Sequence, residues 1–243
     1  TADHKSKVYG SANPALTISY AGLRNGDAAP ATPPAIACAA TAASPAGTYA
    51  VTLTGGADPN YALALADGTL TVTEKLLTVT AEDKSRLYGD ANPALTVTYN
   101  GFVAGDDETD LDTPPTPTCA ATAASAAGTY PISAAGGADT NYAFAYVPGT
   151  LTVDPAPLTC TADDKIKVYG SANPALTIGY AGLRNGDAAP ATPPAIACAA
   201  TGASPVGTYP IALTGGADPN YALTLADGTL TVTEKLLTVT AED

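Results

Sequence analysis

The sequence predicts an all-β protein built from small modules repeated in tandem. Three features predict it: a long internal repeat, short runs in which apolar residues alternate with threonine, and 23 glycines and 21 prolines among 243 residues. Such turn-rich sequences with many short strands are typical of small β-folds. We expect each module to be a β-sandwich or a β-grasp-like domain, and the array to form a rod.

The repeat is defined by the segment that starts Tyr9-Gly10. It recurs almost unchanged from Tyr88 and from Tyr169, at spacings of 79 and 81 residues. Solenoid repeats are shorter, usually 20 to 50 residues, whereas a module of about 80 residues can hold its own small core. We therefore expect module 1 over residues 1–74 without its first strand, module 2 over 75–154, module 3 over 155–234, and the first strand of a following module over 235–243.

Strands are expected where one face is apolar and the other polar. Leu70 and Val72 alternate with threonines in this way, as expected when one face of a strand is buried. The same alternation predicts strands at 16–20, 49–53, 61–65 and 77–81. Asp67-Gly68 stands between two alternating runs, which predicts a hairpin at that point.

The joins between modules are short. Glu74-Lys75 separates modules 1 and 2, and Asp154 to Pro157 occupies the next join. Flexible linkers are longer and rich in Gly and Ser, so we expect neighbouring modules to be held at a defined angle.

Charge and hydropathy exclude several kinds of partner. The chain has 10 basic and 23 acidic residues, a net charge of −13, which argues against nucleic acid and against anionic lipid surfaces. It has no run of 18 apolar residues for membrane insertion, and Thr1 does not begin a signal segment. We expect a soluble piece of a larger protein.

The ordered motifs resemble a known family. Modules 2 and 3 begin with Leu-Thr-Val-Thr-Ala or a close variant, and all three copies then contain Tyr-Gly-x-x-Asn-Pro-Ala-Leu, Gly-Thr-Tyr, Asn-Tyr and Gly-Thr-Leu-Thr-Val. This order is similar to the MBG-type (YGX) repeat of large bacterial extracellular proteins. The resemblance covers nearly the whole chain, and implies a β-rich stalk module of adhesin-like surface proteins with no catalytic residues.

The residues themselves give no catalytic constellation. The chain has one histidine, His4, and the equivalent positions in the other copies are Asp83 and Asp164. A hydrolase would need a nucleophile, a base and an orienting group. No enzyme activity and no cofactor are expected.

Four cysteines leave three alternatives open. Cys38, Cys119 and Cys198 are equivalent positions, while Cys160 replaces Val79 of module 2. No Cys-x-x-Cys pair or Cys/His cluster indicates a zinc site. The cysteines can be buried small hydrophobic residues, Cys160 and Cys198 can form a disulfide within module 3, or they can form intermolecular links.

An acidic loop in module 2 is the one candidate metal site. It includes Asp106, Asp107, Asp110 and Asp112. Calcium prefers such oxygen-rich loops, although the spacing lacks the glycine and distal glutamate of an EF-hand. A solvated acidic loop is the alternative.

The two ends of the chain are complementary in sequence. Thr1-Ala2-Asp3 matches Thr161-Ala162-Asp163, so module 1 begins after its own first strand, while Leu236, Leu237, Thr238, Val239 and Thr240 repeat a first strand. Either the chain is a window of a longer array, or this strand fills the free edge of module 1 in another copy by β-strand addition.

The functional prediction is a stalk or filament module of a repetitive extracellular or cell-surface protein. Its expected partners are further copies of itself, head to tail. Near identity favours this, since residues 1–83 and 161–243 differ at only nine positions. The alternative is a glycan- or mucin-binding adhesin module in which tyrosines such as Tyr20, Tyr49 and Tyr61 bind the sugar.

Overall fold

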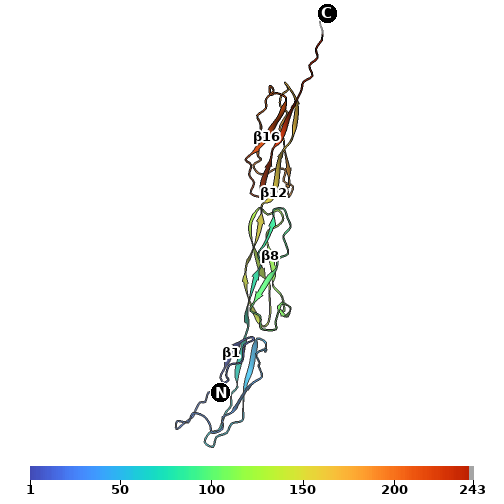
Figure 1. Ribbon diagram of the computed structural model, residues 1–243. Helices are drawn as coiled ribbons and strands as arrows, with labels where there is room; N and C mark the ends of the chain where they lie inside the picture. Colours follow the sequence, from blue (N-terminus) through green and yellow to red (C-terminus); the bar gives the residue numbers. More distant parts are fainter. Residues whose placement is uncertain (241–243) are drawn as a thin grey trace. The chain divides into compact units, whose positions relative to one another are not determined.

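The computed structural model describes residues 1–240, which fold into short β-strands and one 3-10 helix (Figure 1). The fold class predicted from the sequence, tandem all-β modules, is confirmed. Within the described residues, no helix has the length and apolarity needed to cross a membrane.

The strands can be grouped by the three modules expected from the repeat. Module 1 contains β1 (Lys5–Val8), β2 (Ala35–Cys38), β3 (Gly47–Thr54) and β4 (Gly68–Thr73). Module 2 contains β5 (Lys75–Ala81), β6 (Lys84–Leu87), β7 (Val97–Asn100), the 3-10 helix η1 (Glu108–Asp110), β8 (Thr116–Cys119), β9 (Gly128–Ala135), β10 (Tyr142–Val147) and β11 (Gly149–Asp154). Module 3 contains β12 (Ala156–Ala162), β13 (Lys165–Val168), β14 (Ile178–Ala181), β15 (Ala195–Cys198), β16 (Gly207–Thr214), β17 (Tyr221–Ala226) and β18 (Gly228–Thr233).

Each module has a four-stranded sheet of the same topology. The strand orders are β1-β4-β3-β2, β6-β11-β9-β8 and β13-β18-β16-β15. Modules 2 and 3 add a three-stranded sheet, β10-β5-β7 and β14-β12-β17, in which the first strand of the module lies in the centre. That strand pairs parallel with one neighbour and antiparallel with the other.

The chain divides into two compact units. The first comprises Thr1–Glu82, Leu95–Thr118 and Ile132–Gly149, and the second comprises Asp83–Ala94, Cys119–Pro131 and the chain from Thr150 onward. Module 1 therefore belongs to the first unit and module 3 to the second, while module 2 contributes residues to both.

The hairpin expected at Asp67-Gly68 does not form. In module 3 the strands that flank the equivalent turn, β17 and β18, belong to different sheets, and β18 pairs parallel with β13. The Asp67 carboxylate is instead an acceptor for the backbone amide of Leu53 at 2.9 Å. Two alternating runs separated by a turn satisfy the hairpin pattern, but in module 3 each run pairs with other strands, β17 with β12 and β18 with β13 and β16.

The glycine that begins β4 and β18 is required because two backbones cross there. A Cβ atom on Gly68 would lie 2.5 Å from the carbonyl oxygen of Ala2, and one on Gly228 would collide with the carbonyl of Ala162. Only glycine permits this approach.

The core follows the alternation seen in the sequence. Leu70 is fully buried and Val72 nearly so, and in β5 the side chains of Leu77 and Val79 are 0% exposed. Leu76, beside them in the same strand, is 61% exposed. Period-two alternation therefore places one face of each strand in the core.

Two of the strands expected in module 1 are not formed. Residues 61–65 have no strand, and 16–20 form only an isolated bridge between Ala2 and Ile18. Their equivalents in modules 2 and 3 are strands that pair with the first strand of the module. The alternation was correct, but a strand also needs a hydrogen-bonded neighbour.

A buried cation holds two loops together in each module. Lys7 and Lys167 are buried, and their ammonium groups donate to the carbonyls of Ser11 and Ser171 at 3.0 and 3.2 Å. Each ammonium also donates to the carbonyl of a threonine, Thr41 or Thr201.

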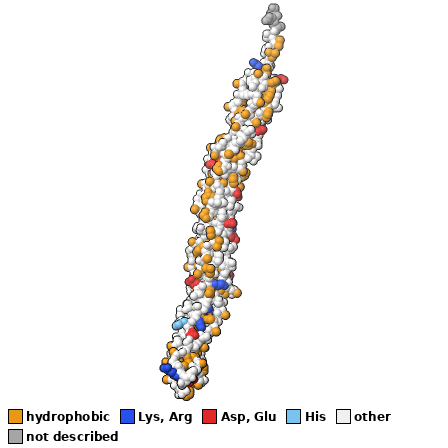
Figure 2. Space-filling view, turned by 90° about the vertical axis from the view of Figure 1, so that its left-hand side faces the viewer, with side chains coloured by type: hydrophobic (Ala, Val, Ile, Leu, Met, Phe, Trp, Pro, Cys, Tyr) orange, Lys and Arg blue, Asp and Glu red, His pale blue; other side chains and the backbone are white. Residues whose placement is uncertain are grey.

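On the face that Figure 2 presents, charged side chains are scattered among hydrophobic and uncharged atoms.

Candidate interface between modules

The tyrosine of the Tyr-Gly motif is the centre of the contact between modules 1 and 2 in the first unit. The Tyr9 hydroxyl donates to Oδ2 of Asp106 at 3.1 Å, and the Tyr142 hydroxyl donates to the same oxygen at 2.6 Å. The two rings meet edge to face with centroids 5.5 Å apart. Aromatic pairs favour this geometry.

The shared carboxylate changes the acidity of both tyrosines. Burial, followed by the hydrogen bond to Asp106, raises the pKa of Tyr9 and of Tyr142. Both effects favour the neutral phenol, which can donate a hydrogen bond to the carboxylate. The Tyr142 hydroxyl in turn accepts from the amide of Val103 at 2.9 Å.

A second contact brings a side chain of module 2 to the backbone of module 1. The side-chain oxygen of Asn141 accepts a hydrogen bond from the amide of Ala46 at 2.9 Å. The backbone carbonyl of the same asparagine accepts from the amide of Lys75 at 2.8 Å. Asn141 therefore ties module 1 to the first strand of module 2.

The same contacts recur between modules 2 and 3 in the second unit. Tyr88 and Tyr221 both donate to Oδ2 of Asp187, at 3.1 and 2.7 Å, and their rings are 5.4 Å apart. The side chain of Asn220 accepts from the amide of Ala127 at 2.8 Å. Two independent copies of one geometry show that the Tyr-Gly motif serves to join modules.

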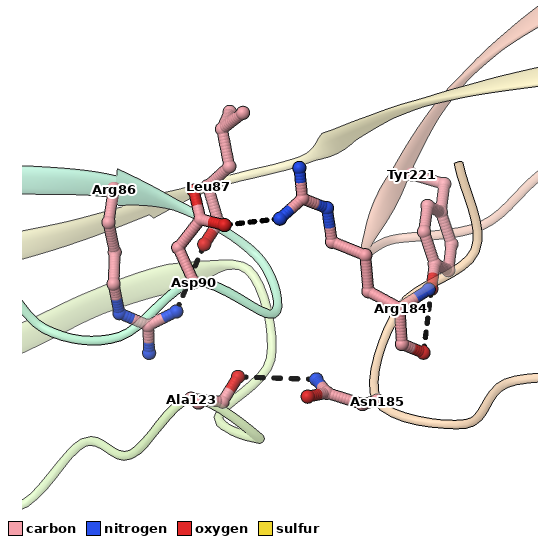
Figure 3. A network of polar contacts seen from close by, with 7 residues as sticks. All are labelled: Arg86, Leu87, Asp90, Ala123, Arg184, Asn185 and Tyr221. Carbon is pink, nitrogen blue, oxygen red and sulfur yellow. Dashed lines mark hydrogen bonds and ion pairs between the residues drawn. The ribbon is translucent and has the colours of Figure 1, made fainter.

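The two junctions differ in the side chain that covers the glycine of the Tyr-Gly motif. In the first unit the side chain of Val103 covers Gly10, so closely that a Cβ atom on this glycine would overlap it. In the second unit Arg184 covers Gly89 instead and forms an ion pair with Asp90 (Figure 3). The backbone of these glycines has φ near +80°, which also favours glycine.

Module 1 has a groove where the other modules hold their first strand. The groove has a volume of about 210 Å³. Its lining includes Ser19, Tyr20 and the segment from Tyr61 to Ala64. The residues equivalent to these walls in module 3 are β14 and β17, which flank β12.

The segment 235–240 has the sequence of a first strand but no strand pairing. It repeats residues 75–80, which form most of β5. Leu236, Leu237 and Val239 are 90%, 82% and 85% exposed. Residues 235–240 therefore repeat the β5 sequence in an exposed, unpaired conformation.

The four acidic residues considered for calcium do not converge. Asp106 bonds to the two tyrosines, and Asp107 accepts from the amide of Thr109 at 2.8 Å at the start of η1. Asp110 accepts from the amide of Asp107, and Asp112 from that of Thr140 at 3.0 Å. In residues 1–240 no group of three or more acidic, histidine or cysteine side chains is arranged to hold a metal ion.

The cysteines are free thiols in the structure, and the Cys160–Cys198 disulfide is not formed. Cys160 is fully buried in β12, where burial raises the pKa of its thiol. Cys198 is half-buried at the end of β15. Both lie on strands, at positions where a small apolar side chain fits.

His4 has a structural partner. Its Nδ1 lies 3.1 Å from the amide of Thr69, at the start of β4. Asp83 and Asp164 accept from the equivalent amides of Thr150 and Thr229, each at 2.7 Å. The single histidine therefore occupies a position at which the other modules cap a strand.

Sequence reasoning missed the junction tyrosines and aspartates. The signal was available, because Asp27, Asp106 and Asp187 are equivalent positions that each follow a glycine. At each junction, however, the aspartate also bonds to a tyrosine of the preceding module, and Tyr9 and Asp106 are separated by 97 residues. No local pattern specifies such a contact.

Comparison with protein families gives a match in each of the three modules. The model of the MBG domain (YGX type) matches residues 1–71, 77–152 and 158–231. The chain belongs to this MBG domain family. The resemblance noted in the sequence is thus confirmed over all three modules, and the YGX motif of the MBG domain is the junction element described above. Comparison with curated proteins gives no match.

Proposed function

We propose that these MBG modules form a structural section of a repetitive extracellular or cell-surface protein, a stalk or filament that is extended by adding modules. The repeated junction supports this role, because the same tyrosine, aspartate and asparagine contacts connect successive modules in both units. A section of this kind gains length from each copy and needs no catalytic site. The family match supports the same class of protein.

We further propose that chains join head to tail by β-strand addition. The single observation that carries this proposal is the groove of module 1, whose walls in modules 2 and 3 flank a first strand. The donor is residues 235–239 of a second copy. A strand added to an unpaired edge gains main-chain hydrogen bonds and pockets for alternate side chains.

The register follows from module 3, in which Leu158 pairs with Leu223 and Cys160 with Leu225. By equivalence, Leu237 of the donor lies opposite Leu63 and Val239 opposite Leu65. The position after Val239 is already filled by Thr1, whose carbonyl accepts from the amide of Ser19 at 2.9 Å. By the same equivalence, donor residues 235–239 take the positions that residues 156–160 have in module 3.

The test uses the alternation of the donor strand. Leu77 and Val79, which correspond to Leu237 and Val239, are buried, whereas the equivalent of Leu236 is exposed. We expect the double variant Leu237→Asp, Val239→Asp to remain monomeric under conditions in which the unaltered chain forms concentration-dependent oligomers. Sedimentation velocity over a range of concentrations measures this, and the contact is heterologous, so open oligomers are expected.

Leu236→Asp is the matched control, since it adds the same kind of charge to the outward face of the same strand. It should assemble as the unaltered chain does. A chain that stays monomeric at every concentration would overturn strand addition. Strand addition would also be overturned if Leu236→Asp lost assembly as fully as the double variant Leu237→Asp, Val239→Asp.

A second candidate function is glycan binding, favoured by a groove in module 2. This groove has a volume of about 460 Å³ and is lined by Tyr99 and Phe102, with Asp107, Glu108 and two threonines. Aromatic faces beside a few polar groups are the usual make-up of a small-molecule site. The tyrosines first considered are less suitable, because the Tyr49 hydroxyl donates to the carbonyl of Pro45 and Tyr61 bonds to Asp27.

A glycan array probed with the full chain tests this candidate. Binding that is lost in Glu108→Gln and retained in Asp67→Asn, a residue outside this groove, would assign the site to module 2. Absence of any glycan signal would remove the candidate and leave the structural role unaffected.

A further inference from the structure

The contacts at the two junctions also indicate which modules can follow one another. We propose that Arg24 fits module 1 to the end of a preceding module that carries the sequence Tyr-Gly-Asp, as module 2 does at Tyr88 to Asp90. This inference rests on the proposed head-to-tail function and names the kind of module that the exposed face of module 1 accepts.

The docked form of this face is seen in the second unit. Arg184 of module 3 forms an ion pair with Asp90, and the side-chain amide of Asn185 donates to the carbonyl of Ala123 at 3.2 Å (Figure 3). The side chains of Arg184 and Asp90 are 34% and 42% exposed, so the pair is partly shielded from water. The aliphatic part of Arg184 covers Gly89.

Module 1 presents the same face without a partner. Arg24, Asn25, Asp27 and Tyr61 have the same identities as their equivalents in module 3. The amide of Arg24 already donates to the Tyr61 hydroxyl at 2.9 Å, and this hydroxyl donates to Asp27 at 2.7 Å. Arg24 is exposed, and its guanidinium has no hydrogen-bond or ion-pair partner among the described residues. The face is therefore formed before anything docks.

Module 2 presents a different face. At the position of Arg24 it has Val103, and at that of Asn25 it has Ala104. Val103 contacts Gly10 of a module whose motif is Tyr-Gly-Ser. The two observed junctions therefore match an arginine to Tyr-Gly-Asp and a valine to Tyr-Gly-Ser.

The exposed end of module 3 is an incomplete match for module 1. It carries Tyr169, which is 46% exposed, followed by Gly170 and Ser171. This end retains the tyrosine and the amide of Val206, which corresponds to Ala46 and Ala127. It lacks the carboxylate that Arg24 would pair with.

The experiment supplies that carboxylate. Ser171→Asp in the full chain should strengthen head-to-tail association about two- to fivefold at low salt, the effect of a partly exposed ion pair. The gain should disappear at high salt, because salt screens such pairs. Sedimentation velocity measures the association of four chains: the unaltered chain, Ser171→Asp, Arg24→Gln and the double variant. Together they form a double-mutant cycle.

Ser171→Asn is the matched control, since it has nearly the shape of aspartate without its charge. A gain seen with Asp, absent with Asn and abolished by Arg24→Gln supports the inference. If the unaltered chain assembles and Ser171→Asp adds nothing, or adds the same with Arg24→Gln, this inference is overturned and the proposed function stands. If neither chain assembles, both head-to-tail strand addition and this inference are overturned.

Discussion

The ten residues from Glu74 and the ten from Glu234 are identical, yet the structure places the described part of each in a different environment. Leu77 is 0% exposed in the centre of a three-stranded sheet, and Leu237, in the same sequence context, is 82% exposed. Replacing each leucine by alanine in separate variants therefore tests the structure with the local sequence held constant.

The expected magnitudes are far apart. Truncating a fully buried leucine costs about 2 to 5 kcal/mol, from the lost transfer free energy and the cavity that remains. Truncating an exposed leucine changes the free energy of unfolding by about 0.5 kcal/mol or less. For a module of this size, 1 kcal/mol corresponds to roughly 4 to 8 °C in Tm. Leu77→Ala should therefore lower the Tm of its module by at least about 8 °C.

Thermal unfolding followed by circular dichroism measures both variants, at a concentration low enough to keep the chain monomeric. Leu76→Ala is the control within β5, because this side chain is 61% exposed and should behave like Leu237→Ala. If Leu237→Ala destabilises the monomer as much as Leu77→Ala, the segment 235–240 packs on its own chain. The proposal that it is free to join another copy would then be wrong.

Three further predictions concern module 3. Gly228→Ala should lower the free energy of unfolding by about 1 to 3 kcal/mol, because its Cβ atom would collide with the carbonyl of Ala162. Gly202→Ala places a Cβ atom in ordinary contact and should leave thermal unfolding nearly unchanged. Lys167→Met should lower the free energy of unfolding by about 1 to 3 kcal/mol, because it leaves two loop carbonyls without a donor. Lys167→Arg should be tolerated, because Arg86 makes the equivalent contact to Thr122. Chemical denaturation compares the two variants, and equal losses of stability would contradict this reasoning. Burial raises the pKa of Tyr221 to about 12, against an ordinary value near 10. Since the folded state favours the neutral phenol, this contribution to stability is complete below about pH 10 and is lost as the pH rises through 12. Ultraviolet titration should show several late tyrosines, Tyr9, Tyr142 and Tyr221 among them, and Tyr221 should titrate earlier in Asp187→Asn.

The sequence by itself determined the class of protein and much of its local structure. The repeat from Tyr9 gave the module length, and alternation at Leu70 and Val72 gave the buried face of a strand, since both depend only on residues close together in the chain. The substitution of Cys160 for Val79 left a buried small residue as one of three alternatives, and the structure has Cys160 fully buried.

The tertiary structure decided which strands pair and which residues meet. Asp67-Gly68 has the pattern of a hairpin, but β4 pairs with β3 and with the parallel strand β1, whose paired residues are about 65 positions away. Residues 61–65 alternate like β17, yet they form no strand, because alternation by itself does not supply a hydrogen-bonded neighbour. Tyr9 meets Asp106 across 97 residues. Local patterns specify the face that a strand buries, whereas hydrogen-bond pairing and side-chain contacts depend on which distant segment is available to fill the adjacent position.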